Sequence, residues 1–379
     1  MTIGYITASD PLDKRSWSGV NYNILKSLEK RGFTVIPLGP TEYSRTQMRF
    51  LTLITKLNSI IFFGKRYNSI HNFSKAFFAA RYFSKKVKQY QLDFIFAPAA
   101  ANEIAFLKTS VPIINLGDTS FNQVRDYYKI FSDLSSFSIM ESNSIESRAI
   151  HKSVAIIYPS QWAAKYVIDY YKADKKKVHV IGFGPNIEVP QQISYNKMYN
   201  GTISFLFLGV DWPRKGGDIA LETIEKLNGR GYKVKLIVCG CIPPKENELM
   251  EVIPFLDKNK PDDNKRLQAL LTECHFLFLP TRAEALGIVF CEASAYGLPI
   301  ITTNTGGVTA AVENGVNGYA LAMDAHSDQY VDIIQDLLNS PEKIVAMSKS
   351  ARQKYETELN WDIFGEKFEH LVESLKSTF

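Results

Sequence analysis

The sequence of 379 residues contains no long hydrophobic run. Nowhere are about eighteen consecutive residues both uncharged and predominantly apolar, as a membrane-spanning helix requires. The opening residues, MTIGYITASDPLDKR, are typical of a strand followed by a polar loop and not of a signal peptide. We therefore expect a cytoplasmic globular protein whose length allows two or three domains, each with its own core.

Cysteine is scarce, and its spacing does not fit a metal site. The four cysteines show neither CxxC spacing nor a cluster with histidine, and they fall in or beside apolar segments: Cys239, Cys241, Cys274 and Cys291. Free cysteine is among the most buried residue types in proteins. We expect all four to be reduced core residues.

Acidic residues are almost missing from residues 41–90. This segment holds ten lysines and arginines but a single acid, Glu42, and aromatic residues are interleaved with the bases. Two interpretations stay open: core helices with a solvated basic face, or a surface that meets anionic lipid head groups or an anionic acceptor. Nucleic acid is a third and weaker alternative. Attraction to phosphate would not by itself distinguish it from an anionic lipid or acceptor. We expect no nucleic-acid partner.

Strand-length apolar runs alternate with helix-length amphipathic segments along the whole chain. The first six runs are typical of buried parallel strands: 2–7, 33–39, 92–98, 111–117, 154–160 and 178–184. After a polar, proline-containing linker, the pattern restarts with five more runs: 203–210, 233–241, 251–256, 275–280 and 298–303.

This pattern predicts an α/β fold of two Rossmann-like domains, each with a doubly wound parallel sheet. The expected domains are 1–188 and 189–358, joined by the linker at 185–200, with a C-terminal helix at 359–379 that packs back on the first domain. Such sheets bind ligands at the carboxyl ends of their strands. Functional residues are therefore expected in strand-to-helix loops that face a cleft between the domains.

One loop of this kind carries two glutamates. In PTRAEALGIVFCEASAYGLPIITTNTGG, which starts at Pro280, Glu284 precedes an expected helix, Gly287 begins it and Glu292 lies on its second turn. A helix start presents N–H groups and the positive end of the helix dipole to an anion. Carboxylates repel phosphate but accept hydrogen bonds from hydroxyls. The arrangement predicts a nucleotide sugar, with ribose at Glu292, the transferred sugar at Glu284, and diphosphate at the backbone of Ala285, Leu286, Gly287 and Ile288.

The wider string resembles a known family. EALGIVFCEASAYGLPIITTNTGG, followed by NGVNG at Asn314–Gly318, resembles the E-x7-E signature of the retaining GT-B glycosyltransferases of family 4. The resemblance covers most of the chain, through a glycine loop after the first strand, VAIIYPSQWAA, VHVIGFGPN and FLFLGVDWPRKGGDIALE. It implies the GT-B fold and transfer of a glycosyl group to an acceptor hydroxyl with retention of anomeric configuration.

The resemblance also implies a pair of cations that hold the diphosphate. In the loop GVDWPRKGG, Lys215 occupies the family's lysine position, whereas Val210 stands where the family has an arginine. Arg214 is a candidate for the second cation, with a solvated arginine as the alternative. Two cations and a helix start would stabilise the departing diphosphate without a metal ion. We therefore expect no metal and no cofactor, since the nucleotide sugar is the substrate.

Further candidates lie at other strand ends. Gly19, in the loop SWSGV, could present N–H groups to the donor, unless Ser18 simply caps the helix that follows. Asp118 follows the strand IINL, where the resemblance implies a side chain that lines the sugar pocket, with a turn cap as the alternative. By resemblance, the nucleotide base is expected against residues at two strand ends: Gly240, Phe255 and Leu256.

These expectations combine into one reaction. A hexosyltransferase of class EC 2.4 would move a sugar from a nucleotide diphosphate, UDP favoured and GDP next, to a glycan or lipid-linked acceptor in cell-surface polysaccharide biosynthesis. Lys215, Glu284 and Asp118 would be catalytic, and segment 41–90 would touch the inner face of the cell membrane. A sucrose-synthase-like or phosphorylase-like enzyme and a binding protein without turnover stay open. A dinucleotide oxidoreductase is disfavoured, because no GxGxxG follows the first strand of either domain.

Overall fold

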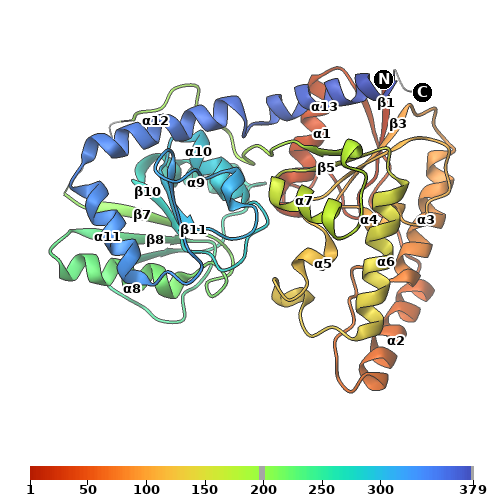
Figure 1. Ribbon diagram of the computed structural model, residues 1–379, viewed down its shortest axis with the longest axis horizontal. Helices are drawn as coiled ribbons and strands as arrows, with labels where there is room; N and C mark the ends of the chain where they lie inside the picture. Colours follow the sequence, from red (N-terminus) through yellow and green to blue (C-terminus); the bar gives the residue numbers. More distant parts are fainter. Residues whose placement is uncertain (196–200, 377–379) are drawn as a thin grey trace. The chain divides into compact units, whose positions relative to one another are not determined.

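The computed structural model describes residues 1–195 and 201–376. The chain forms two compact units: unit 1 comprises residues 1–181 and 365–379, and unit 2 comprises residues 182–364. The expected linker at 185–200 and helix at 359–379 each extend into residues outside the described ranges, namely 196–200 and 377–379. Each unit is built on one six-stranded sheet (Figure 1).

The sheet of unit 1 is parallel throughout, with strand order β2-β1-β3-β4-β5-β6. Its strands are β1 (Thr2–Tyr5), β2 (Thr34–Pro37), β3 (Phe94–Pro98), β4 (Ile113–Leu116), β5 (Ala155–Tyr158) and β6 (Val178–Val180). All six coincide with expected apolar runs. Every residue of β3, β4 and β5 is buried, because helices cover both faces of the sheet.

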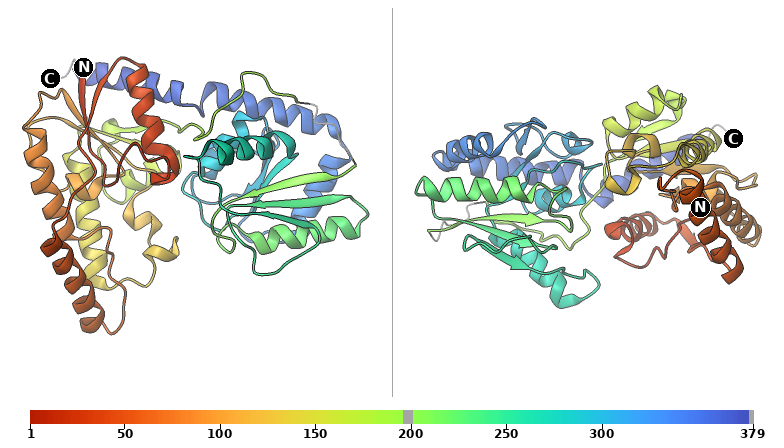
Figure 2. Two further views of the ribbon diagram at one scale, coloured as in Figure 1. Left: turned by 180° about the vertical axis from the view of Figure 1, so that it is seen from behind. Right: turned by 90° about the horizontal axis from the view of Figure 1, so that it is seen from below.

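The helices of unit 1 are α1 (Val20–Lys30), α2 (Arg45–Ile61), α3 (Phe73–Val87), α4 (Ala101–Ile104), α5 (Phe121–Val124), α6 (Ser136–Lys152), α7 (Gln161–Asp169) and α13 (Trp361–Lys376) from Gly365 onward. One face of the sheet is covered by α1 and α13, and the other by α3, α4 and α6 (Figures 1 and 2).

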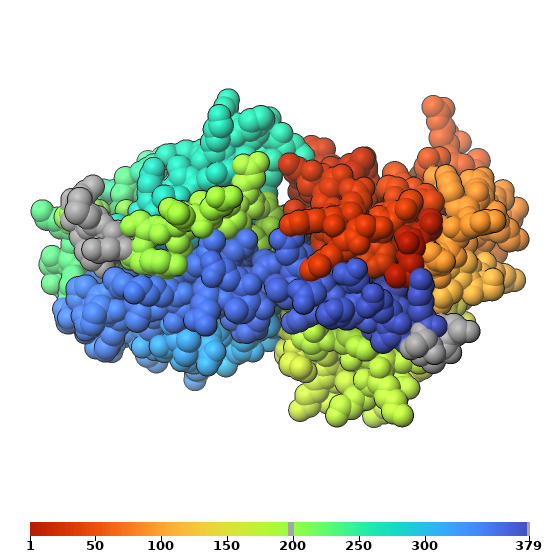
Figure 3. All heavy atoms as spheres, turned by 90° about the horizontal axis from the view of Figure 1, so that it is seen from above, coloured from red at the N-terminus to blue at the C-terminus, as the bar shows by residue number. Residues whose placement is uncertain are grey.

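Alternate residues of β3 show which helices each face meets. Ile95 and Ala97 belong to a buried cluster with Phe83 of α3, whereas the Phe96 ring packs against Phe368 of α13, with ring centroids 4.7 Å apart. Arg31, at the end of α1, pairs with Glu366 and Glu369 of α13. Figure 3 shows the dark blue carboxyl-terminal residues lying against the red residues of α1. From Gly365 onward, α13 is therefore an integral part of unit 1, whereas its first four residues belong to unit 2.

The sheet of unit 2 is also parallel, with strand order β12-β11-β10-β7-β8-β9. Its strands are β7 (Ile203–Leu208), β8 (Val234–Cys239), β9 (Met250–Ile253), β10 (Phe276–Leu279), β11 (Ile300–Thr303) and β12 (Gly318–Leu321). The expected runs include five of these strands and miss β12. The sequence of β12, GYAL, contains too few large apolar residues to be recognised as a strand.

The helices of unit 2 are α8 (Gly217–Gly229), α9 (Pro261–Glu273), α10 (Ile288–Ala295), α11 (Ser327–Leu338) and α12 (Pro341–Thr357). One face of the sheet is covered by α9, α10 and α12, and the other by α8 and α11 (Figure 2). The expected fold class, two parallel α/β sheets of the Rossmann type, is confirmed.

Three of the four cysteines are buried and Cys241 is half-buried, and all four are free. Within residues 1–195 and 201–376, no three histidine, cysteine, aspartate or glutamate side chains gather closely enough to hold a metal ion. Over the same ranges, every helix is too short or too polar to cross a membrane.

Candidate functional site

The loop between β10 and α10 depends on a glycine. Gly287 occupies the N-cap position of α10 with φ of 85°, in the left-handed region that glycine adopts readily. A Cβ at this position would lie 2.5 Å from the Phe290 ring and 3.1 Å from Cγ of Glu284. The backbone of Gly287 thus places Glu284 beside the amino end of α10.

Two cations from another loop meet Glu284. Lys215, in the loop after β7, donates a hydrogen bond from Nζ to Oε2 of Glu284, and both residues are buried. Arg214 lies on the same side, with its guanidinium 3.6 Å from Oε2 of Glu284 and donating to the Ala283 carbonyl at 2.9 Å. One carboxylate therefore faces two cations at the start of α10, and Arg214 also pairs with Asp211, whose Oδ2 lies 3.6 Å from its guanidinium.

The approach of these two loops requires Gly216. This residue has φ of 74°, and a Cβ would lie 1.9 Å from the carbonyl oxygen of Pro280. Any other residue would push the loop after β7 away from the loop after β10, because the obstacle is backbone. Gly216 thus allows Lys215 to reach Glu284.

The second glutamate has a lysine of its own. Glu292 is 2% exposed on α10, and its Oε1 accepts a hydrogen bond from Nζ of Lys258 at 2.5 Å. Lys258 comes from the polar loop after β9. The residues flanking it, in DKNK, are typical of a solvated loop, so the sequence offered no signal that would single out Lys258.

The residues expected around the nucleotide base lie only partly together. Gly240 and Phe255 line an open hollow of about 780 Å³ together with Val210 and Cys241. Phe255 is 60% exposed, so one face of its ring is available for stacking. Leu256 is half-buried and does not line this hollow.

Unit 1 carries a strained loop after β1. Trp17, Ser18 and Gly19 all have positive φ, at 47°, 56° and 92°. Such a conformation costs on the order of 1–3 kcal/mol at each non-glycine residue and is often found at functional sites. Gly19, not Ser18, occupies the cap position of α1, so the alternative in which Ser18 caps that helix is wrong.

This loop reaches Asp118, which follows β4. The indole Nε1 of Trp17 lies 3.4 Å from Oδ2 of Asp118, within donating distance. Asp118 also lines a cavity of about 180 Å³ at the carboxyl ends of β3, β4 and β5. Asp118 and Gly19 therefore both lie at the edge of unit 1 where parallel sheets bind ligands.

Sequence comparisons cover both units. A family model described as Glycosyltransferase Family 4 matches residues 19–189, and one described as Glycosyl transferases group 1 matches residues 188–354. The chain belongs to the glycosyltransferases of family 4. The family resemblance expected from the motifs is confirmed.

Two curated relatives share more than a third of their aligned residues with this chain. Spore coat protein SA of Bacillus subtilis is 35% identical over 170 residues, 41% of this chain and 45% of that protein. The GDP-mannose-dependent alpha-(1-6)-phosphatidylinositol monomannoside mannosyltransferase of Mycobacterium tuberculosis is 38% identical over 168 residues, 41% of this chain and 43% of that protein. The chain spans about half the length of the curated relatives it matches.

Solved structures extend the likeness to the whole fold. Sucrose-phosphate synthase of Thermosynechococcus elongatus superposes with a TM-score of 0.68 at 14% identity, covering 100% of this chain and 99% of that chain. HepE of Anabaena, solved in complex with UDP-glucose, gives 0.66 at 15% identity, covering 99% and 100%. The chain therefore has the GT-B fold.

The basic aromatic segment 41–90 divides into a buried and an exposed part. Phe83 and Tyr67 are buried, so the core interpretation holds for α3 and the loop before it. Of the residues of α2, all of which are described, one is buried, Asn58. Seven large apolar residues of α2 and the turn after it are at least 45% exposed, whereas Leu51, Ile54 and Phe62 are half-buried. The seven exposed residues are Met48, Phe50, Leu53, Leu57, Ile60, Ile61 and Phe63.

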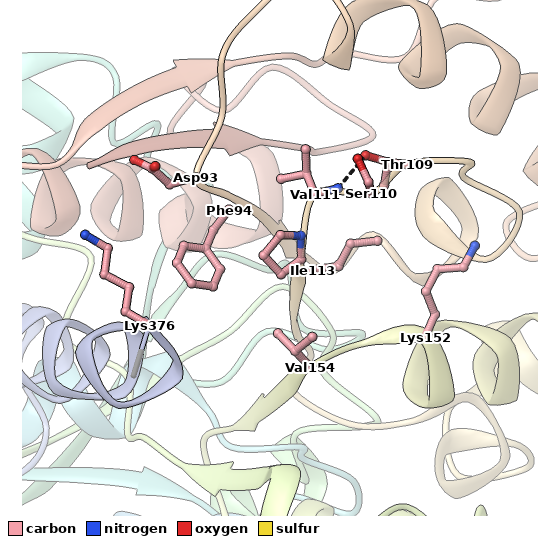
Figure 4. A pocket seen from close by; sticks show the side chains of 10 residues that line it. Asp93, Phe94, Thr109, Ser110, Val111, Ile113, Lys152, Val154 and Lys376 are labelled. Atoms are coloured by element: carbon pink, nitrogen blue, oxygen red, sulfur yellow. Dashed lines mark hydrogen bonds between the residues drawn. The ribbon is translucent and has the colours of Figure 1, made fainter. Parts of the chain in front are cut away.

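A further hollow of about 540 Å³ lies at the amino ends of β3, β4 and β5 in unit 1 (Figure 4). Lys376 and Lys152 stand on opposite sides of Phe94 and Ile113 in this view. Lys152 donates from Nζ to the carbonyl oxygens of Ile104, Ala105 and Leu107, so it closes the end of α4. Because parallel sheets bind ligands at the opposite edge, we assign no site to this hollow.

Proposed function

We propose that the protein is a retaining glycosyltransferase that moves a sugar from a nucleotide diphosphate to a hydroxyl of a glycan or lipid-linked acceptor. The observation that carries this proposal is the meeting of Lys215, Arg214 and Glu284 at the amino end of α10. A helix start with two cations suits a diphosphate, and a buried carboxylate beside it suits the hydroxyls of a sugar.

The donor would bind along this constellation. Lys215 has three N–H donors, of which Glu284 takes one, so the others can reach phosphate oxygens. Glu292 would accept hydrogen bonds from the ribose, held in position by Lys258. The base would enter the hollow lined by Phe255 and Gly240.

The chemical step needs stabilisation of a leaving group. The bond between the anomeric carbon and the diphosphate oxygen breaks, and the acceptor oxygen forms its bond on the same face of the sugar. The acceptor proton passes to the departing phosphate oxygen. Lys215 and Arg214 balance the charge that develops on the diphosphate, a contribution of about 3–4 kcal/mol for one well-placed donor. The proposal therefore includes no metal ion and no cofactor.

Names of relatives support the choice of donor. HepE was solved with UDP-glucose, and the mycobacterial relative is named for its dependence on GDP-mannose. We favour a UDP-sugar and place a GDP-sugar next. The same mycobacterial name, a phosphatidylinositol mannoside mannosyltransferase, supports a lipid-linked acceptor.

The exposed face of α2 supports contact with an anionic membrane. At about 100° per residue, Arg45, Arg49 and Lys56 form one stripe, and Leu53 and Ile60 lie in the apolar stripe beside it. A basic stripe next to an exposed apolar stripe is typical of helices that lie in the membrane interface. A membrane contact there would bring unit 1 to a lipid-linked acceptor and place the protein on the inner face of the cell membrane.

The decisive experiment measures release of nucleoside diphosphate from a panel of UDP-, GDP- and ADP-sugars. We expect turnover with one base, UDP first, and a product whose anomeric configuration, determined by NMR, equals that of the donor. An inverted product would contradict the retaining mechanism. Absence of release from every donor, with or without acceptor lipids, would contradict the proposed function as a whole.

A further inference from the structure

A small cavity in unit 1 has the features of a ligand site. It measures about 180 Å³ and lies where the carboxyl ends of β3, β4 and β5 meet α5 and α6. Pockets for drug-sized ligands run to about 300–1,000 Å³, so this cavity suits a single ring. Ala99, which lines it, has φ of 49°, a strained backbone of the kind found at functional sites.

Two polar atoms of the lining have no hydrogen-bond partner among the described residues. Ser120 is 1% exposed and its Oγ is unpaired, and Nδ1 of His71 is likewise buried and unpaired. Leaving a buried polar group unpaired costs about 1–3 kcal/mol. A ligand hydroxyl in the cavity would remove this cost at either group, because a hydroxyl both donates and accepts.

The third polar group is a buried carboxyl. Glu146 of α6 is 5% exposed and lines the cavity, and its carboxylate accepts a hydrogen bond from the Phe121 N–H. Burial, together with the charge of Asp118, raises the pKa of Glu146 to about 7. Around neutral pH, Glu146 is therefore partly protonated and can donate to a ligand oxygen as well as accept from a hydroxyl.

The remaining walls are aromatic. The His71 ring stacks on Phe131, with an interplanar angle of 11°, and meets Phe121 edge to face. Tyr128 and Tyr158 complete the lining on this side. Flat apolar walls opposite a few convergent polar groups are the usual composition of a small-molecule site.

We propose that this cavity binds one uncharged polyhydroxyl ring, a sugar or cyclitol, of the acceptor. The assignment deepens the proposed glycosyl transfer and rests on it. The described residues that line the cavity include two acids, Asp118 and Glu146, and no lysine or arginine. A phosphorylated or carboxylated ring would bring its charge next to these carboxyl groups, and no cation of the lining would balance it, which is unfavourable.

Binding is tested on the full chain without nucleotide sugar. Saturation-transfer NMR compares methyl glycosides of glucose, galactose and mannose with their 6-phosphates, and myo-inositol with inositol 1-phosphate. We expect one neutral ring to bind, and its phosphorylated partner to bind at least about tenfold more weakly. The proposal is overturned if no neutral ring binds, if the phosphorylated partner binds equally well, or if only an amino sugar such as glucosamine binds.

Ser120→Ala locates the binding. Loss of one hydrogen bond to the ring should weaken its affinity about three- to tenfold. Ser110→Ala is the matched control, since Ser110 precedes β4 at the opposite end of the strand that Ser120 follows. Equal affinities of the two variants would overturn the assignment.

A variant that gains binding excludes misfolding as the cause of the loss expected for Ser120→Ala. Ala101 lines the cavity from the start of α4 and is half-buried, so a lysine there can place its cation at the rim. Ala101→Lys should raise the affinity of the phosphorylated ring about tenfold. An unchanged affinity would show that the ring binds elsewhere and would overturn the proposal.

These measurements need neither donor nor turnover. If a neutral ring binds as expected but no donor releases nucleoside diphosphate, the proposed function fails and the cavity assignment to a ring survives. If donors turn over but neutral rings do not bind, only the cavity assignment fails.

Discussion

Lys215 donates a hydrogen bond to Glu284 across 69 positions of the chain. Both side chains are buried, with 6% and 8% of each residue exposed. They meet because β7 and β10 are neighbours in a parallel sheet, so the loops that follow them leave the same edge. The proposed diphosphate site is therefore built from two loops that the sheet brings together.

The first prediction concerns catalysis. Lys215→Ala should lower kcat about 10²- to 10³-fold, because the lysine would balance charge that develops on the leaving diphosphate. Glu292→Ala should chiefly weaken donor binding, and Glu284→Ala should do some of both. Release of nucleoside diphosphate against donor concentration separates these effects. Lys233→Ala, an exposed lysine before β8, is the control, and full activity in all three site variants would refute the assignment.

The second prediction isolates the clash at Gly216. Gly216→Ala adds a Cβ 1.9 Å from the Pro280 carbonyl oxygen, whereas Gly231→Ala, at φ of 90°, meets nothing within 4 Å. In both variants the alanine must adopt a left-handed backbone, which lowers the free energy of unfolding by about 1–2 kcal/mol. Because of the clash, Gly216→Ala should lower the free energy of unfolding by about 2 kcal/mol more than Gly231→Ala does, as measured by urea denaturation. Equal losses would show that the loops do not approach closely.

The third prediction concerns the pair of Lys258 and Glu292. Lys258→Met leaves a buried carboxylate without its cation and should cost about 1–3 kcal/mol of unfolding free energy, less than for a wholly buried pair because the Lys258 side chain is 21% exposed. Adding Glu292→Gln should recover part of this loss. Lys260→Met, at an exposed position nearby, should change little. If the effects of Lys258→Met and Glu292→Gln are additive, the two side chains do not interact and the prediction is wrong.

The fourth prediction is a pH dependence of stability. Burial raises the pKa of Glu103 to about 7, above that of an exposed glutamate. The fold thus favours the protonated form of Glu103. The resulting stabilisation of the folded state is complete below about pH 4.5 and disappears as pH rises through 7. Glu103 should therefore lower the free energy of unfolding by about 2–3 kcal/mol between pH 5 and pH 8, and Glu103→Gln should remove this part of the profile.

Urea denaturation at several pH values tests this expectation. Glu146, whose pKa is also raised to about 7, should account for a further part of the fall that Glu103→Gln leaves in place. Glu42→Gln, at an exposed position, is the control and should leave the profile unchanged. An identical pH profile for Glu103→Gln and the unsubstituted protein would contradict the prediction.

The fifth prediction concerns the membrane. Ile60 and Phe63 are 73% and 98% exposed, and replacing both by glutamate removes apolar area and adds charge that repels anionic lipid. Sedimentation with vesicles containing phosphatidylglycerol should show at least about a tenfold loss of binding. Met323→Glu, 54% exposed in unit 2, should bind as the unsubstituted protein does. Equal binding to vesicles of phosphatidylcholine alone would contradict an electrostatic contact.

Apolar runs predicted the strands well, because a strand buried on both faces must be apolar at nearly every position. They failed at β12, which pairs with β11 alone at one edge of its sheet and needs less apolar surface. The position of Phe255 near the end of β9 was also predictable. That Leu256 does not line the hollow was not predictable, because the direction of its side chain depends on how the chain turns after the strand.

The sequence by itself determined the fold class, the family and the loops that hold the candidate residues, since periodicity and motif spacing are local properties. Tertiary structure alone decided which of these side chains contact one another. It placed Arg214 beside Glu284 while Val210 lines another hollow, and it joined Lys258 to Glu292 across 34 positions. The physical reason is that strand order and loop backbone set the direction of each side chain, and neither is visible in the spacing of residues along the chain.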